Sequence, residues 1–463
     1  MRINQAIRTP APRTHEGAVA LRISPYMQLR RTVLSCLLWE DEFYEDGKGI
    51  AQRIAELIPQ IDHRKVAALA IEARDQMHLR HVPLLVLAEL EKVARGSSLI
   101  GDTLAVVIQR PDELAEYLAI AAKQNGITAD KLKPKLGNQV RLGLAAAFGK
   151  FSEYSLQKYN RDGAIKLRDV MRLCHPKPKD AYQAAMWKRL LAGELATPDT
   201  WEAQLSAGAD KRDTFERLIR DGKLGYFALI RNLRNMEQAG VDRALVREAI
   251  LARQNGADKV LPFRFVAAAR HAPSYERELD QALVATIAEL PRLDGRNVVL
   301  VDVSGSMDGK MSGKSELTRL DAAATLASMI NADDLRVMTF SDALVEVPAR
   351  RGMAGVEAIT KSQPHSGTRL AEAITELNRR VDYDRLIVIT DEQSHPGSIP
   401  APKGARMEII TGPGVDNNAV KRGGGYLINV ASARNGIGYG SMWTHLDGFS
   451  ENVLRWIMEV EAA

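Results

Sequence analysis

Five oxygen-bearing side chains occupy positions where buried strands are expected to end. They are Asp302, Ser304, Ser306, Thr368 and Asp391. The first three form a D-x-S-x-S motif at the end of the apolar run NVVLVDV, and the last follows a second apolar run, RLIVIT. In open α/β sheets, ligands gather at the carboxyl ends of the strands. A carboxylate and two hydroxyls on one tight turn suit a hard cation, so we expect a divalent-cation site, most simply for Mg²⁺.

These positions resemble the metal-ion-dependent adhesion site of von Willebrand factor A domains. The resemblance extends over residues 295–463. Five short apolar runs, NVVLVDV, LRVMTF, RLIVIT, RMEII and YLINV, alternate there with helical stretches at 316–331 and 369–380, and SENVLRWIMEV is expected to form a last amphipathic helix. Such alternation predicts a doubly wound, Rossmann-like α/β sheet. The resemblance implies that the metal keeps one open coordination position, which an acidic side chain or a phosphate of a partner would fill.

A second set of side chains with possible chemistry lies in the segment SLQKYNRDGAIKLRDVMRLCHPKPKD, residues 155–180. Its basic members are Lys158, Arg161, Lys166, Arg168, Arg172, His175, Lys177 and Lys179. Arg168 and Arg172 are four residues apart and so share one face of the expected helix. Ammonium and guanidinium groups placed so close together indicate an anion-binding surface. The alternative is a solvated charged face without a ligand.

The charge of the chain is unevenly distributed. The formal net charge is +5, but residues 1–300 carry 46 basic and 37 acidic side chains, whereas residues 301–463 carry 17 and 21. Residues 121–190 alone hold 15 basic and 5 acidic side chains. The net positive charge of this segment is larger than that of the whole chain. It is therefore the part expected to bind phosphate backbones.

Residues 155–180 resemble the TROVE signature of the Ro ribonucleoprotein family. The positions that match are Lys158, Tyr159, Gly163, Arg168, Asp169, Arg172, Leu173 and His175. Three further segments resemble other blocks of that family: 80–90, 225–236 and 260–270. The similarity therefore covers nearly the whole chain, and a helical domain joined to an A domain is the family's own architecture. Arg231 and Arg234, in the second of these segments, are interpreted as packing and surface residues.

The resemblance implies a ring of HEAT-like repeats. In the family, the outer basic surface of the ring binds structured Y RNAs, and its central hole accepts single-stranded 3′ ends of misfolded RNAs. Lys158 and His175 match family positions at the RNA surface. Asp162 stands where the family has an arginine, with Arg161 one place earlier. That departure weakens the case for the Y-RNA-specific contact and leaves a general phosphate role intact.

The elements that must position these groups follow from hydrophobic periodicity. Residues 28–285 are helical in pattern throughout; one stripe comprises Ile50, Ile54, Leu57, Ile58 and Ile61. Paired helices without a strict sequence period predict a degenerate repeat array. We therefore expect an all-α HEAT-like (TROVE) domain at 1–290 and the von Willebrand A domain at 291–463.

Composition narrows the class of protein. The chain has no apolar run long enough to span a membrane and no secretory signal at its first residues. Its two cysteines, Cys36 and Cys174, lie in apolar helical patterns and are expected to be buried free thiols. These features predict a cytoplasmic protein, and a closed helical ring with an A domain would suffice as a monomer.

Catalysis is not expected. The chain shows no HExxH motif and no Ser/His/Asp arrangement, and GKMSGKS at 309–315 has one residue too few between its glycines for a phosphate-binding P-loop. The metal motif has too few carboxylates for two-metal nuclease chemistry. The favoured function is a non-catalytic protein that binds small structured, Y-like noncoding RNA and single-stranded RNA ends. The metal site could recruit a protein such as a ribonuclease. The alternative is a protein-interaction scaffold that grips an acidic partner through the A domain.

Overall fold

The chain divides into two compact units. The computed structural model describes residues 24–35, 47–126, 136–160, 163, 165–197, 199–260, 262–290, 292–310, 317–393, 398–399, 408–409, 424–431, 443–447 and 457. The first unit comprises Met1–Cys36, Glu40–Gly47 and Leu283–Ala463, and the second comprises Leu37–Trp39 and Lys48–Ala282. Helix α1 (Pro25–Ser35) thus clusters with the sheet-containing unit, although the sequence placed it in the helical domain that was expected to end at residue 290.

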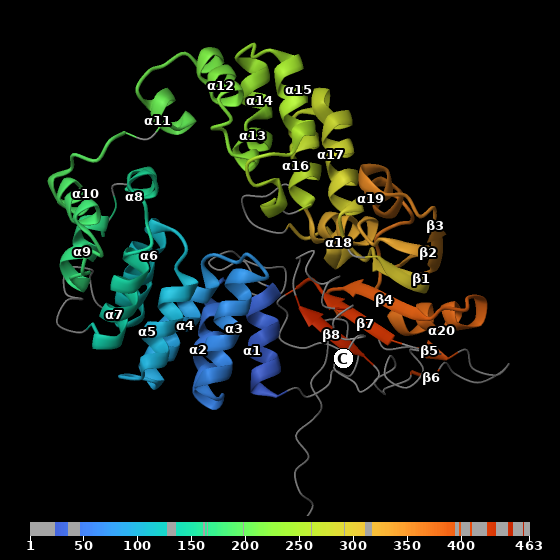
Figure 1. The fold of residues 1–463 in the computed structure, drawn as a ribbon. Helices are drawn as coiled ribbons and strands as arrows, with labels where there is room; N and C mark the ends of the chain where they lie inside the picture. Colours follow the sequence, from blue (N-terminus) through green and yellow to red (C-terminus); the bar gives the residue numbers. More distant parts are fainter. Residues whose placement is uncertain are drawn as a thin grey trace, which may run out of the picture. The chain divides into compact units, whose positions relative to one another are not determined.

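The second unit is helical throughout its described residues (Figure 1). Its α-helices are α2 (Gly47–Leu57), α3 (His63–Asp75), α4 (Val82–Val93), α5 (Ser98–Val107), α6 (Pro111–Gln124), α7 (Asn138–Phe148), α8 (Glu153–Tyr159), α9 (Leu167–Cys174), α10 (Ala181–Ala192), α11 (Trp201–Ser206), α12 (Lys211–Arg220), α13 (Tyr226–Arg231), α14 (Leu233–Gln238), α15 (Arg243–Ala252) and α16 (Phe263–His271). Helix α17 (Glu276–Ala288) spans the boundary between the units.

Packing in the second unit is local along the chain. Helix α3 packs against α4 and α5, α5 against α7, α7 against α9, α12 against α14 and α15, and α13 against α14 and α16. Contacts restricted to near neighbours are typical of helical repeat arrays, in which each pair buries its apolar faces against the next. The predicted HEAT-like architecture of this region is confirmed.

The predicted apolar stripe forms part of this core. Ile50 and Ile54 of α2 are fully buried, as is Ile58 in the 3₁₀ turn that follows. Capping side chains mark where helices begin. At the start of α3, the Asp62 carboxylate accepts hydrogen bonds from the backbone N–H groups of Arg64 and Lys65 at 3.0 and 3.2 Å. These N-caps satisfy amides that the helix itself leaves unpaired, and so fix where each helix begins.

The first unit is built on a six-stranded sheet. Its order is β3-β2-β1-β4-β7-β8, and a separate two-stranded sheet joins β5 and β6. The strands are β1 (Leu293–Asp302), β2 (Ala332–Phe340), β3 (Leu344–Val347), β4 (Arg385–Thr390), β5 (Ser398–Ile399), β6 (Glu408–Ile409), β7 (Gly424–Asn429) and β8 (Thr444–Asp447). All pairs in the large sheet are parallel except β2 with β3. The predicted doubly wound α/β domain is confirmed.

Helices cover both faces of this sheet. Helix α20 (Leu370–Arg380) lies on one side, and α18 (Arg319–Ser328) with α19 (Gly352–Thr360) lies on the other (Figure 1). Alternate strand residues such as Val298, Leu300 and Val388 join one core cluster with α20. Trp443 belongs to the same cluster and is 7% exposed. Burial on two faces explains why these strands read as continuous apolar runs in the sequence.

Four of the five predicted strand runs lie in the large sheet, as β1, β2, β4 and β7. The fifth, RMEII, contributes β6 to the small sheet instead. The short strand β3 and helix α19 were not predicted, because neither has a long periodic pattern. The expected C-terminal helix, SENVLRWIMEV, lies outside the described residues except for Ile457. No helix in the described ranges is long and apolar enough to cross a membrane.

Candidate metal site and basic surface

The candidate metal site lies where two adjacent parallel strands end. Val301 of β1 is paired with Ile389 of β4, so Asp302 at the end of β1 and Asp391 just beyond β4 come to the same edge of the sheet. In the sheet, β1 lies between β2 and β4. Strands β2 and β3 are added on one side of β1, and β4, β7 and β8 on the other, so the strand order reverses between β1 and β4. Such switch points are where doubly wound sheets bind ligands.

The carboxylate of Asp302 is fully buried and held by two donors. The backbone N–H of Ser304 donates to Oδ1 at 2.9 Å, and the hydroxyl of Thr390 donates to Oδ2 at 2.6 Å. The hydroxyl oxygens of Ser304 and Ser306 are 3.1 Å apart. The D-x-S-x-S turn therefore presents its oxygens as one compact group.

The loop that carries Thr368 is tied to the same turn. The backbone N–H of Gly305 donates to the carbonyl of Ser366 at 3.0 Å. The N–H of Ser366 and the carbonyl of Gly367 both engage the hydroxyl of Ser341, at 2.8 and 3.0 Å. Thr368 is 1% exposed within this loop. All five predicted residues thus lie on loops that meet at one edge of the sheet; their role as ligands stays a prediction.

Electrostatics at this edge favour a cation. Burial raises the pKa of Asp302 to about 7, and the negative charge of Asp391 contributes to the same shift. Two buried carboxylates so close together are costly when both are ionised, and a divalent ion would offset that cost. Among the described residues, no group of three or more His, Cys, Asp or Glu side chains is placed to hold a metal. The donor set of two carboxylates and three hydroxyls therefore fits a hard, oxygen-preferring ion better than zinc.

Sequence reasoning missed three residues that support this edge. Glu392, next to Asp391, has a φ of 61° and is fully buried. Its carboxylate contacts Arg31 of α1 at 2.9 Å and is hydrogen bonded to His445 of β8. The three residues lie far apart in the sequence, so no local pattern could have found them.

A further pair of residues lies at the rim of the site. His365 Nδ1 is 2.8 and 3.0 Å from the two carboxylate oxygens of Asp308, and its Nε2 is 3.0 Å from the carbonyl oxygen of Thr360. Asp308 is in the turn that follows Ser306, and its side chain is 51% exposed. This contact joins the D-x-S-x-S turn to the Thr368 loop on the solvent side.

The basic segment lies on α8, α9 and the start of α10. Arg168, Arg172, His175, Lys177 and Lys179 are exposed, whereas Lys158 and Lys166 are half-buried. Arg161 lies outside the described residues, as does Asp162. Helix α9 buries the opposite face through Val170, Met171 and Cys174, as the sequence predicted. Burial raises the pKa of the Cys174 thiol to about 12, so this cysteine is a packing residue rather than a reactive one.

His175 ends α9 in an unusual backbone conformation. It has φ 49° and ψ 55°, the left-handed region, and its N–H donates to the carbonyl of Met171 at 2.9 Å. Few residues other than glycine adopt this region, and histidine is among those that do so more often. The cap turns the chain sharply, so Lys177 and Lys179 follow on the exposed side.

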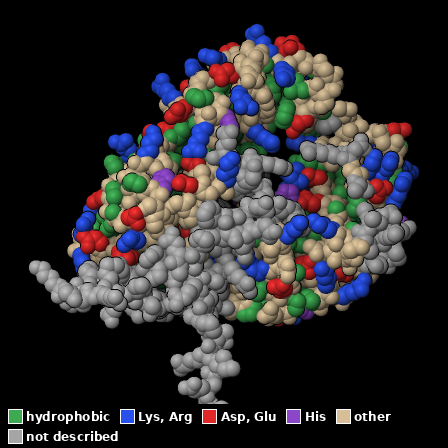
Figure 2. All heavy atoms as spheres, turned by 180° about the vertical axis from the view of Figure 1, so that it is seen from behind, with side chains coloured by type: hydrophobic (Ala, Val, Ile, Leu, Met, Phe, Trp, Pro, Cys, Tyr) green, Lys and Arg blue, Asp and Glu red, His purple; other side chains and the backbone are tan. Residues whose placement is uncertain are grey.

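Aromatic rings surround Lys158. Its Nζ is 5.9 Å from the ring centre of Tyr154 and 5.8 Å from that of Tyr159. The Arg110 guanidinium lies 4.3 Å from the Tyr159 ring centre, and Tyr154 is 49% exposed. Cations held over aromatic faces with an exposed ring beside them offer both charge and a stacking surface. On the face shown in Figure 2, basic side chains are interspersed with acidic ones, so a binding surface has to be located from such local groups.

Comparison with known protein families supports both halves of the fold. Residues 181–289 match the TROVE domain, and residues 297–393 match the von Willebrand factor type A domain. The second range contains all five candidate metal ligands. The first begins directly after the basic segment, which resembles the family signature but lies outside the matched range.

Individual relatives are similar over different shares of the chain. Over 427 residues the chain is 23% identical to the RNA-binding protein RO60 of Deinococcus radiodurans, and this match covers 77% of this chain and 78% of that protein. Over 88 residues it is 36% identical to telomerase protein component 1 of the mouse, and this match covers 17% of the chain and only 3% of the mouse protein. The corresponding rat protein is 35% identical over 88 residues.

A solved structure has the same fold. The crystal structure of the Ro (RSR) protein of Deinococcus radiodurans superposes with a TM-score of 0.60 at 18% identity, and the match covers 93% of this chain and 97% of that one. Together with the two domain matches, this likeness confirms the resemblance on which the sequence interpretation was based.

Proposed function

This chain joins a TROVE domain to a von Willebrand factor type A domain, and from that pairing we propose a non-catalytic RNA-binding protein of the cytoplasm. It binds small structured, Y-like noncoding RNA and the single-stranded 3′ ends of misfolded RNA, a role in RNA quality control. The relative that aligns over most of the chain is named an RNA-binding protein, which supports the ligand class.

The observation that carries the proposal is a set of exposed cations that are not paired with any carboxylate in the described part of the chain. No described carboxylate forms an ion pair with Arg168, Arg172, Lys177 or Lys179. Two arginines elsewhere in the same unit, by contrast, are paired: Arg189 with Glu153 at 2.6 Å and Arg217 with Asp199 at 2.6 Å. Unpaired cations on one segment are available for phosphates, and the counterions that the RNA releases on binding supply affinity.

The fold also suggests how RNA classes are distinguished. Structured RNA is recognised mainly by shape and backbone contacts, because the deep groove of an A-form helix hides its bases. The exposed cations of α9 and the following turn suit such contacts. Single-stranded ends expose their bases, so their capture needs aromatic or planar side chains as well.

The A domain would add a second partner. Asp302, Ser304, Ser306, Thr368 and Asp391 would hold a divalent cation, which when bound would attract an anionic oxygen of a protein ligand. Ser304 and Thr390 fix the Asp302 carboxylate by hydrogen bonds, and the loop that carries Thr368 is joined to the same turn through the Gly305 N–H and the Ser366 carbonyl. A ribonuclease with an exposed acidic side chain is the kind of partner that this site would bring to bound RNA.

The test is the RNA that copurifies with the protein from its own cells. Lys158→Ala/His175→Asn is the informative variant, since asparagine tolerates the left-handed backbone at position 175 and so preserves the fold. Arg64→Ala, an exposed arginine of α3 outside the basic segment, is the matched control. A few discrete small RNAs that are retained by the control and absent from the double variant support the proposal. The absence of enriched RNA from the wild type contradicts it.

The alternative is a protein-interaction scaffold that grips an acidic partner through the A domain. It is supported by the compact oxygen cluster at the sheet edge. Metal-dependent capture of a protein, abolished in Asp302→Asn and indifferent to ribonuclease treatment, would favour this alternative. A scaffold without RNA has no use for Arg168, Arg172, Lys177 and Lys179, with which no described carboxylate pairs, and for that reason the RNA-binding function is preferred.

A further inference from the structure

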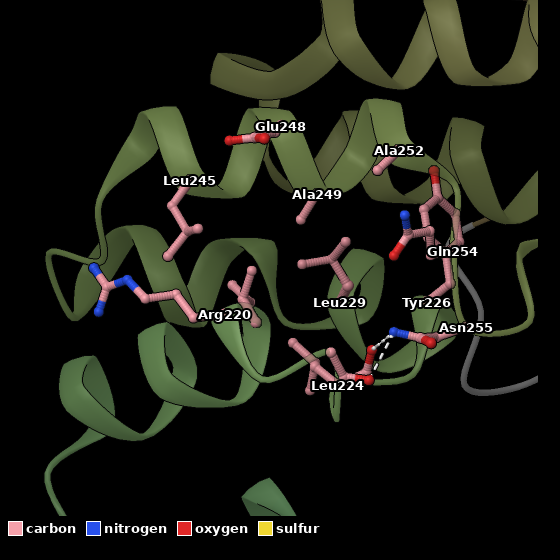
Figure 3. Close-up of a pocket in the computed structure, with 12 residues that line it drawn as sticks. Arg220, Leu224, Tyr226, Leu229, Leu245, Glu248, Ala249, Ala252, Gln254 and Asn255 are labelled. Carbon is pink, nitrogen blue, oxygen red and sulfur yellow. Dashed lines mark hydrogen bonds between the residues drawn. The ribbon is translucent and has the colours of Figure 1, made fainter.

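Helices α13 and α16 are joined by an aromatic contact. The ring centres of Tyr226 and Phe265 are 6.0 Å apart. The Tyr226 hydroxyl donates a hydrogen bond to the carbonyl of Ile250 at 2.8 Å. Tyr226 also lines a cavity of about 240 Å³ (Figure 3), whose wall is closed by hydrogen bonds from the Asn255 amide to the carbonyls of Gly222 and Leu224. The buried side of α13 is therefore fixed in place.

On each helix, a residue adjacent in sequence to this aromatic pair faces solvent. Phe227 follows Tyr226 and is 43% exposed, and Arg264 precedes Phe265 and is also exposed. The Arg264 guanidinium lies 5.7 Å from the ring centre of Phe227 and 5.0 Å from that of Phe263. The rigid contact between the helices thus holds an exposed aromatic ring beside a planar cation.

A second arginine lies on the same face. Arg231 is four residues after Phe227 on α13, so the two side chains are neighbours on one side of the helix. Arg231 is exposed, and no described carboxylate pairs with it or with Arg264. The pKa of Arg264 is lowered because the surrounding protein shields part of its guanidinium from water, and the positive charge of Arg231 lowers it further. Two cations that repel one another, and that no described carboxylate neutralises, are prepared for an anionic ligand.

We propose that Phe227, Arg231 and Arg264 bind one nucleotide of single-stranded RNA, with its phosphate between the two arginines and its base stacked on the Phe227 ring. The inference rests on the proposed RNA-binding function and gives it a second site, apart from the basic segment at 155–180. We name these three residues the α13/α16 site.

The exposed ring selects a nucleotide over other anions. An acidic peptide would satisfy the arginines but would leave Phe227 without a planar partner. A base in single-stranded RNA is free to stack on an aromatic side chain, and such contacts tolerate any sequence because every base has a π-face. Bases inside a duplex are already stacked, so the α13/α16 site should prefer single strands.

The test compares two fluorescently labelled probes, a 12-nucleotide oligouridine and a blunt-ended RNA hairpin, bound to the full chain. Phe227→Leu removes the ring and keeps an apolar side chain; we expect oligouridine affinity to fall about tenfold, and Phe227→Tyr to restore it. Arg231→Gln/Arg264→Gln should lower the salt dependence of oligouridine binding, with the slope falling by about 0.7 for each phosphate that the protein no longer neutralises. Hairpin binding should not change in any of these variants.

Arg64→Gln is the matched control, because it removes an exposed arginine of the same unit far from α13 in the sequence. Photocrosslinking gives an independent readout in the wild type: oligonucleotides with 5-iodouridine should label the peptide that contains Phe227. The control variant should retain both the affinity and the crosslink, and thermal unfolding of each variant should match the wild type, since all three side chains are exposed.

The outcomes separate this site from the general function. Variants that bind oligouridine as the wild type does, with no crosslink at Phe227, overturn the α13/α16 site and leave the RNA-binding function standing. A site that binds an acidic peptide in preference to oligouridine overturns it as well. A wild type that binds neither the oligouridine nor the hairpin refutes the proposed function and this inference with it.

Discussion

Arg31 Nη1 lies 2.9 Å from Glu392 Oε1, and both side chains are completely buried. Arg31 is in α1, and Glu392 follows the second carboxylate of the candidate metal site, 361 positions later in the chain. The backbone N–H of Glu392 donates to the hydroxyl of Thr390 at 3.0 Å, and that hydroxyl donates to Asp302. A continuous set of contacts therefore connects α1 to the Asp302 carboxylate of the candidate metal site.

Breaking this ion pair should destabilise the sheet-containing unit. In Arg31→Met the Glu392 carboxylate loses its buried cation, and removal of one partner of such a pair costs about 3–5 kcal/mol. Hydrogen exchange followed by mass spectrometry should show faster exchange for peptides of β4 and β8 than in the wild type.

The double variant Arg31→Met/Glu392→Gln is the control for that experiment. It removes both charges, so it should be less destabilised than the sum of the two single changes. If the amides of β4 are equally protected from hydrogen exchange in Arg31→Met and in the wild type, the ion pair does not stabilise the sheet.

Mg²⁺ should raise the thermal stability of the wild type. A ligand that binds only the folded state stabilises it by about 2.7 kcal/mol at a hundredfold excess over its dissociation constant. Asp302→Asn should abolish that response, because it removes one of the two carboxylates while keeping an oxygen to accept from Ser304 N–H.

Asp308→Asn should respond to Mg²⁺ like the wild type, since Asp308 is an exposed rim residue paired with His365. Without added metal, Asp302→Asn should be at least as stable as the wild type, because a buried carboxylate next to Asp391 is costly. A metal response that persists in Asp302→Asn would place the cation elsewhere.

Removal of charge from α9 should weaken RNA binding in a salt-dependent way. In Arg168→Gln/Arg172→Gln, the slope of log affinity against log salt should fall by about 0.7–0.9 for each phosphate that the protein no longer neutralises. Anisotropy titrations with a structured RNA between low and moderate salt measure this slope. If Arg64→Gln changes the slope as much, the effect reflects net charge and not a site on α9.

Purified protein should leave RNA intact in the presence of Mg²⁺. In-line phosphodiester cleavage commonly uses two metal ions. The candidate site has only two carboxylates, and its three hydroxyls are not suited to hold a second metal ion. Incubation of labelled RNA with the wild type and with Asp302→Ala tests this expectation. Cleavage by the wild type that disappears in the variant would make the protein a nuclease.

The thiol of Cys174 should react slowly in the native protein. With its pKa raised to about 12, only roughly one molecule in ten thousand carries the thiolate at pH 8. In a Cys36→Ser background, modification by a thiol reagent should become fast only when the protein is denatured. Rapid native modification would mean that α9 opens readily from α7.

The sequence alone predicted the two kinds of domain, because their signals are local. Helical periodicity over residues 28–285 and short β-branched runs after residue 291 each reflect how one element buries its own apolar side. The D-x-S-x-S turn was visible for the same reason, since its oxygens lie within a few residues of each other. The unpredicted α19 and β3 are short and carry no such periodicity.

Only the tertiary structure showed which distant residues meet. Arg31, Glu392 and His445 are buried together because α1 packs beside β8, a contact that no sequence period encodes. Likewise, the sequence indicated that Arg231 is a packing or surface residue, and only the tertiary structure showed that α13 and α16 pack together so that Phe227 and Arg264 are neighbours. Local patterns determine which elements form. The role of a charged side chain or an exposed ring depends on neighbours that folding brings from elsewhere in the chain.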